Sequence, residues 1–114
     1  NFIKSNYKCE ETGNELKLIF NVDGGRTQLV FAVVNDFHVE FASPFASVNA
    51  VTAKQALDAS SNYPLGIGIV GSFYSVKHIA PIADLDPSEI AEGFDYVTKI
   101  ADMLEQNLVG GDNL

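Results

Sequence analysis

Two histidines, one cysteine and fifteen acidic residues are the side chains of this sequence that could carry acid–base, nucleophilic or metal chemistry. His38 and Glu40 are two residues apart in a stretch that alternates apolar and polar residues. In a strand, both would point to one face, opposite to the face that carries Phe37, Val39 and Phe41. We therefore expect a solvated outer face there, with structural or surface roles for its polar groups.

The second histidine, His78, follows Lys77 and has no acidic or thiol group at metal-ligand spacing. Nucleophilic catalysis would need Ser or Cys with a histidine and an orienting acid, and no nucleophile-elbow sequence is present. The sequence therefore predicts no catalytic, metal-binding or cofactor-binding residue.

Cys9 is the single cysteine, which rules out a disulfide within the chain and fits a reducing, cytoplasmic location. A reactive thiol is usually activated by a nearby histidine or a helix N-terminus. Cys9 instead lies between Lys8 and Glu10 in a strand-like run. We interpret it as a structural or edge-strand residue.

Gly66, Gly68 and Gly71 match the spacing G-x-G-x-x-G of dinucleotide-binding loops. Such a loop must open a helix whose N-terminus holds the pyrophosphate. Here a second strand-like run, Phe73 to Ala80, follows, and no helix is expected before Pro87. We interpret the glycines as part of a strand and a turn.

The net charge of −8 argues against binding to nucleic acid or to anionic lipid, because an acidic surface repels phosphates. Eight acidic residues and a single base, Lys99, lie from Asp84 onward. No stretch approaches the roughly 20 apolar residues that would cross a bilayer. We expect no nucleic-acid partner and no membrane span.

Hydrophobic periodicity predicts an opening antiparallel meander of three or four strands joined by tight turns. The turns are at Asp23-Gly24-Gly25 and Asn35-Asp36, and Ser43-Pro44 is expected to end the last strand. The strand-like runs are Tyr7–Glu11, Glu15–Val22, Gln28–Val34 and Phe37–Phe41.

Helix formers are enriched after this meander, from Asn49 to Ser60, with Asn49 as the expected N-cap. The apolar face of this predicted helix is small: Ala53, Ala56 and Leu57. A second hairpin, with strands Leu65–Val70 and Phe73–Ala80, should follow.

The last helix has the clearest start signal, with Asp86 as N-cap, Pro87 at the first position and Glu89 three residues after the cap. Leu85 and Ile90 should form a hydrophobic staple, and Gly110-Gly111 should end the helix. Its apolar face is wider than one sheet edge needs, so either it covers the whole sheet or a second chain shares it. The candidate partner or dimer face is Phe94, Val97, Ile100, Ala101 and Leu104.

These elements predict one α+β domain over residues 1–114: an antiparallel sheet built from strands, a helix, a two-stranded hairpin and a long C-terminal helix. Asn1 is not a methionine, and Phe2 falls at once into a strand-like pattern. We therefore expect an N-terminal helix to be missing.

The order and texture of these elements resemble the YbjN-like bacterial proteins, whose fold is shared with type III secretion chaperones. The likeness runs from about Tyr7 to Leu108. It is carried by the helix ending at Ser60-Ser61-Asn62 and by the segments ELKLIFNVDGGRTQLVFAVVNDFHVEF, GIGIVGSFYSVKHIAPIADL and DPSEIAEGFDYVTKIADMLEQNL.

The resemblance implies a type III secretion chaperone-like fold and a function without catalysis. Type III secretion chaperones are small, acidic homodimers that bind unfolded effector segments and hydrolyse nothing. YbjN-like proteins are linked to regulation and stress responses. The usual first helix of the family is not found in this sequence, and a fourth strand in the meander would depart from the chaperone pattern.

We therefore expect a cytoplasmic, non-enzymatic protein-binding or chaperone-like regulatory module that binds a protein partner, forms a homodimer, or both. The alternative is a small-ligand or lipid-binding domain, with an apolar pocket between sheet and helix lined by Phe20, Phe31 and Phe41. A third hypothesis is an enzyme, which would need a cleft that gathers His38 or His78 with carboxylates.

Overall fold

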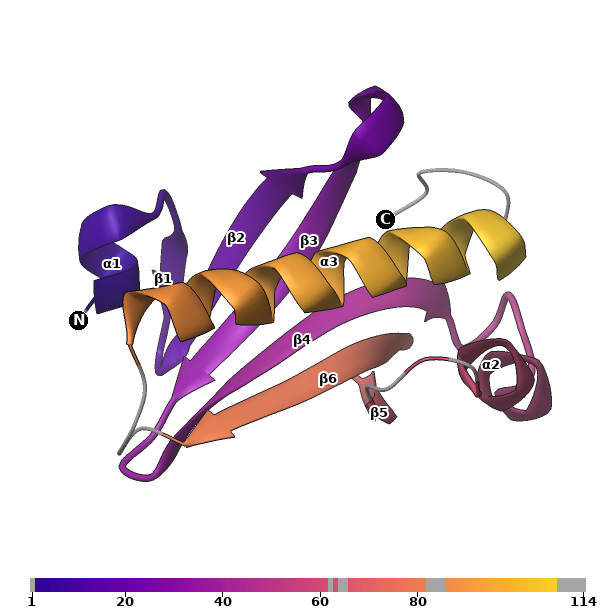
Figure 1. Cartoon of the computed structure of the whole chain (residues 1–114). Coiled ribbons are helices and arrows are strands. Elements are labelled where there is room, and N and C mark those ends of the chain that lie inside the picture. The colour runs from indigo at the N-terminus through magenta and orange to yellow at the C-terminus, as the bar shows by residue number, and fades with distance from the viewer. Residues whose placement is uncertain (1, 62, 64–65, 82–85, 109–114) are drawn as a thin grey trace.

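The computed structural model describes residues 2–61, 63, 66–81 and 86–108, and in these residues a long helix lies across one face of a six-stranded antiparallel sheet (Figure 1). The strand order is β1-β2-β3-β4-β6-β5. This confirms the predicted α+β class and antiparallel sheet. The elements are α1 (Phe2–Asn6), β1 (Glu10–Thr12), β2 (Glu15–Asn21), η1 (Asp23–Gly25), β3 (Thr27–Val34), β4 (His38–Ser47), α2 (Ala53–Ser60), β5 (Gly66–Val70), β6 (Phe73–Pro81) and α3 (Pro87–Leu108).

The start of the chain differs from the strand-like pattern expected there. Residues Phe2–Asn6 form the short helix α1, which buries Ile3 in the core. β1 is confined to Glu10–Thr12, at one edge of the sheet, so most of the run Tyr7–Glu11 is not strand. The aromatic ring of Tyr7 instead packs against the ring of Phe94 on α3.

Pro44 does not end its strand, contrary to the prediction. β4 continues to Ser47, and its register against β6 shifts between Pro44 and Ala46. Proline lacks the N–H that a regular ladder needs, and such an irregularity accommodates it. The Nε2 of Gln28, a buried residue on β3, donates a hydrogen bond of 2.6 Å to the carbonyl oxygen of Pro44.

The helix α2 begins later than predicted, because Thr52 and not Asn49 is its N-cap. The Thr52 hydroxyl accepts from the Gln55 amide, and the Gln55 side chain accepts from the Thr52 amide, which makes a complete capping box. Of the predicted apolar face, only Ala56 is buried, while Leu57 is 59% exposed. The helix therefore touches the rest of the molecule through a narrow strip.

The start of α3 is confirmed at Asp86, whose carboxylate accepts from the Glu89 amide at 3.0 Å. The expected staple residue Leu85 and the stop signal Gly110-Gly111 lie outside the described residues. The helix packs mainly on β4 and β6 and also contacts β3.

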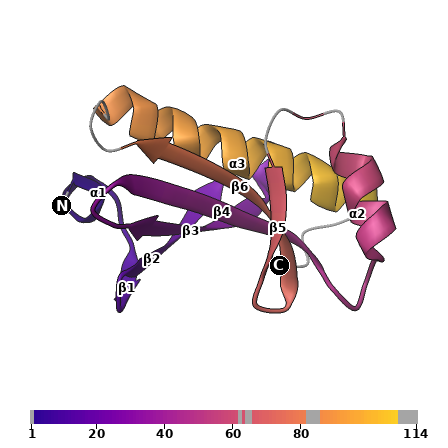
Figure 2. The ribbon, with the colours of Figure 1, turned by 90° about the horizontal axis from the view of Figure 1, so that it is seen from below.

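Strand alternation gives the sheet two different faces. The face toward α3 holds most of the core, whereas no helix lies on the opposite side of β2, β3 and β4 in the described part of the chain (Figure 2). We call this opposite side the open face. The side chains buried on the α3 side include Leu16, Leu18, Val30, Ala32, Val39, Phe41 and Val76.

Candidate functional site

The five residues of the candidate dimer face on α3 all lie in the core of the single chain. Each of these side chains is at most 8% exposed, and Phe94 packs on Phe41 with ring centroids 5.0 Å apart. Of the two possibilities left open by the wide apolar face, the structure shows the first, a helix that covers its own sheet. The face that is buried comprises Phe94, Val97, Ile100, Ala101 and Leu104.

The apolar pocket expected from Phe20, Phe31 and Phe41 does not form. Phe41 pairs with Ala32 and faces α3, whereas Phe31 pairs with Ala42 and therefore faces the open side of the sheet. The register between β3 and β4 thus separates two of the three rings by the thickness of the sheet.

The two histidines lie on opposite faces of the sheet and form no common site. His38 contacts Asn35 at 3.0 Å, and Glu40, two residues later, forms an ion pair of 2.6 Å with Lys77. His78 stacks on the ring of Phe41, on the α3 side. Among the described residues, no group of three or more His, Cys, Asp or Glu side chains could hold a metal ion.

The glycine motif is part of a hairpin, as interpreted from the sequence. Gly66 and Gly68 belong to β5, and Gly71 has a φ of +62° in the turn that leads directly into β6. Cys9 is half-buried just before the edge strand β1.

The open face carries an apolar patch along β3 that was not predicted as a site. Cross-strand pairing places Ile19 on β2 opposite Leu29 on β3. Glu40 on β4 pairs with Val33 on β3 and with Ile79 on β6, so it lies between these two residues. Ile19 is 65% exposed and Ile79 is 55% exposed. We call the surface formed by Ile19, Leu29, Phe31 and Val33 the open-face patch, and Ile79 lies beyond it, on the far side of Glu40.

Charged residues of both signs border the open-face patch on two sides. Glu15 and Lys17 flank it on β2, and the Glu40–Lys77 ion pair flanks it on β4 and β6. Next to the exposed Ile19 side chain is a shallow hollow of about 200 Å³. The hollow is lined by Lys17, Ile19, Thr27 and Leu29.

A second surface feature lies between β2 and α3, where aromatic rings gather. The ring centroids of Tyr7 and Phe20 are 6.1 Å apart, and both rings lie about 5 Å from the ring of Phe94. Together with Asp95 they line a hollow of about 220 Å³, which we call the aromatic hollow. Its full lining is Tyr7, Phe20, Asn21, Ala91, Phe94, Asp95 and Thr98.

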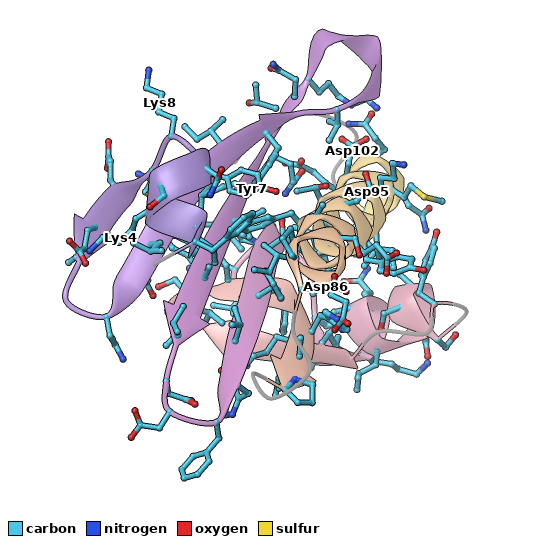
Figure 3. All side chains as sticks on the ribbon, turned by 60° about the vertical axis from the view of Figure 1, so that its left-hand side comes forward. Lys4, Tyr7, Lys8, Asp86, Asp95 and Asp102 are labelled. Atoms are coloured by element: carbon cyan, nitrogen blue, oxygen red, sulfur yellow. The ribbon has the colours of Figure 1, made fainter. Side chains whose placement is uncertain are left out.

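The aromatic hollow continues into a larger, more polar hollow of about 350 Å³, because Asn21, Asp95 and Thr98 line both. Figure 3 shows Asp95 and Asp102 on the side of α3 toward the β2–β3 hairpin, with Tyr7 over the sheet between α1 and α3. We call the two hollows together the α3 groove.

A bidentate ion pair at the polar end of the α3 groove joins the β2–β3 hairpin to α3. Arg26 donates from Nε and from one terminal nitrogen to the two carboxylate oxygens of Asp102, at 2.9 and 2.7 Å. Asp102 is almost fully buried, so its charge is held in place by this partner. The two residues are 76 positions apart, and no local sequence signal marks them as partners.

The sequence matches no family model and no curated protein sequence in comparisons with known proteins. None of the helices in the described part of the chain is both long and apolar enough to cross a membrane.

Proposed function

We propose that this chain is a non-enzymatic protein-binding module, and that its open-face patch binds a second copy of the same chain. The observation that carries the proposal is the apolar composition of the exposed face over the central strands. An antiparallel sheet that stays solvated usually carries polar residues on its outer face. Here β3 contributes Leu29, Phe31 and Val33 to that face and no charged residue.

The layout of the open-face patch resembles the anatomy of protein interfaces. Such interfaces have a centre depleted of charge and a polar rim that remains accessible to water. Aromatic residues are enriched at the centre, which is where Phe31 lies. The rim is formed by Glu15, Lys17, Glu40 and Lys77.

The distribution of charge favours contact between two copies through the open-face patch over contact through their other, acidic surfaces. Each chain carries a net charge of −8, so two copies repel each other unless they meet through surfaces that are not acidic. The four rim residues sum to zero, with one acid and one base on each side of the patch. A two-fold arrangement can therefore bring unlike charges together at the rim.

The shape of the patch is also suited to self-association. A symmetric dimer needs a surface that is complementary to itself, so that a protrusion of one copy meets a recess of the other. The exposed Ile19 side chain lies beside the hollow formed with Thr27 and Leu29. Ile19 of each copy can fill the hollow of the other.

The chaperone-like regulatory role in a bacterial cytoplasm belongs to the same proposal and rests on the resemblance to YbjN-like proteins alone. That resemblance and the open-face patch both favour binding over catalysis.

The test is the mass of the protein in solution, measured by sedimentation velocity over a concentration series up to 1 mM, a range chosen to reach weak dimers. We expect a concentration-dependent dimer for the natural sequence and a monomer for Ile19→Asp, because a charge at the centre of an apolar interface is costly. The control is Leu57→Asp, on an exposed residue of α2, which should dimerise like the natural sequence. Circular dichroism checks that both variants are folded.

Two outcomes would contradict the proposal. One is a natural sequence that remains monomeric over the whole concentration series. The other is a folded Ile19→Asp variant that dimerises as well as the Leu57→Asp control.

A further inference from the structure

We propose that the aromatic hollow binds an organic cation, namely the guanidinium or ammonium group of an arginine or lysine side chain on an extended segment of a partner protein. This site lies on the α3 side of the sheet and is separate from the open-face patch. The inference goes beyond self-association and does not depend on it.

The aromatic rings supply the first part of the argument. Tyr7 and Phe20 are half-buried, so part of each ring surface borders the hollow, while Phe94 closes it from the core. The faces of aromatic rings carry partial negative charge and attract cations within about 6 Å. Edge-to-face contacts of Tyr7 with Phe2, Phe20 and Phe94 hold its ring in place before any ligand arrives.

Asp95 supplies a carboxylate at the same hollow. Its present partner is Lys99, at 3.0 Å, and both side chains of this pair are more than half exposed. Exposed ion pairs of this kind contribute little to stability, so an incoming cation can replace Lys99 without a large cost. The other carboxylate of the α3 groove, Asp102, is already bound through both oxygens by Arg26.

The dimensions of the α3 groove favour a polypeptide segment over a free amine. The groove borders α3 from Ala91 to Met103, which corresponds to about 18 Å of helix. An extended segment of about five residues has the same length. A cationic side chain would occupy the aromatic hollow while the flanking residues lie along the polar part. The charge of −8 on the chain attracts such a basic segment.

The direct test is a titration with the peptide acetyl-Gly-Ser-Arg-Ser-Gly-amide, followed by the NMR signals of the aromatic rings. We expect the ring signals of Tyr7 and Phe20 to shift. The matched peptide with citrulline, a neutral group of nearly the same shape, should bind at least about fivefold more weakly because the cation–ring attraction is lost. Equal binding of the two peptides, or no shift of either ring, would overturn the proposal.

Tetramethylammonium chloride tests whether the cation must come from a peptide. If tetramethylammonium binds much more weakly than the arginine peptide, the result supports a polypeptide partner that uses the whole α3 groove. Equal binding would overturn this assignment in favour of a free amine.

Substitutions at three exposed positions on α3 distinguish binding at the aromatic hollow from general attraction of the peptide by an acidic surface. Asp95→Asn should weaken binding of the arginine peptide about fivefold, whereas Lys99→Gln should strengthen it, because the competing partner of Asp95 is removed. Glu92→Gln removes an equal charge three residues from Asp95 and should leave binding unchanged. If Glu92→Gln weakens binding as much as Asp95→Asn, net charge and not the hollow attracts the peptide, and the proposal fails.

Discussion

The carboxylate of Asp86 determines where the longest helix begins. It accepts a hydrogen bond of 2.6 Å from the Ser88 hydroxyl and one of 3.0 Å from the Glu89 amide. These bonds favour the charged form and hold the pKa of Asp86 below its ordinary value of 3.8. The negative charge also lies at the positive end of the helix dipole.

Removal of this cap should destabilise the protein in a pH-dependent way. A carboxyl group whose pKa is lower in the folded state stabilises that state above its unfolded pKa, and the contribution disappears as pH falls through the folded pKa. We therefore expect Asp86→Ala to lower the melting temperature at pH 7 and the difference from the natural sequence to shrink below about pH 4. Thermal unfolding between pH 2.5 and 7 measures this difference, and a constant or growing difference at low pH would contradict the assignment.

Arg26 and Asp102 illustrate what could not be predicted about single residues. Hydrophobic periodicity places Asp102 outside the apolar face of the last helix, yet its side chain is nearly fully buried. Its burial is possible because Arg26 reaches it from the β2–β3 hairpin. The pairing depends on how the hairpin packs beside α3, which no local pattern encodes.

Among the elements, α3 depends on a close approach to β4 at Gly93. A Cβ atom at this position would lie 2.7 Å from Cε2 of Phe41, and that ring packs in the core against Phe94. The glycine therefore allows the helix to lie close to the central strand.

Gly93→Ala should destabilise the protein, although alanine in a helix normally stabilises it by about 1 kcal/mol relative to glycine. We expect a loss of about 1–3 kcal/mol, because the added methyl group overpacks the core. Urea unfolding measures the change. The double variant Gly93→Ala/Phe41→Leu should lose less stability than the sum of the losses of the two single variants, because the smaller side chain makes room for the methyl group. A higher urea midpoint for Gly93→Ala alone would contradict the prediction and show that the helix can move away from β4 without cost.

At the scale of the whole molecule, the proposed self-association depends on where the charged residues lie relative to the open-face patch. The chain has a net charge of −8, while the patch has a balanced rim. Repulsion between copies therefore acts through the rest of the surface and is screened by salt, whereas apolar contact at the patch is not weakened by salt.

Raising the NaCl concentration from 50 mM to 500 mM should strengthen the dimer, because the distance over which charges act falls to a few ångströms. Sedimentation equilibrium at both concentrations gives the dissociation constant, with Ile19→Asp as the monomeric control. A dimer that dissociates at high salt would mean that ion pairs, and not the open-face patch, hold the two copies together.

The sequence alone determined the features that depend on local chemistry. The alternation of apolar residues identified β2, and a continuous run of β-branched and aromatic residues identified β3. The Asp86 cap and the apolar stripe identified α3, and the hairpin-like connections indicated the α+β class. Pro44 was a wrong stop signal, because the register of β4 against β6 shifts directly after it, between Pro44 and Ala46, and this irregularity accommodates the proline.

Only the tertiary structure decided which apolar residues are covered and which are exposed. The residues Val97 and Leu104, expected at a partner face, are core because α3 lies across its own sheet, and Phe31 is on the open face because β3 pairs with β4 in one particular register. A change of register by one residue would turn every side chain of a strand to the other face. Strand register and helix position depend on contacts between distant segments, and a local pattern does not contain them.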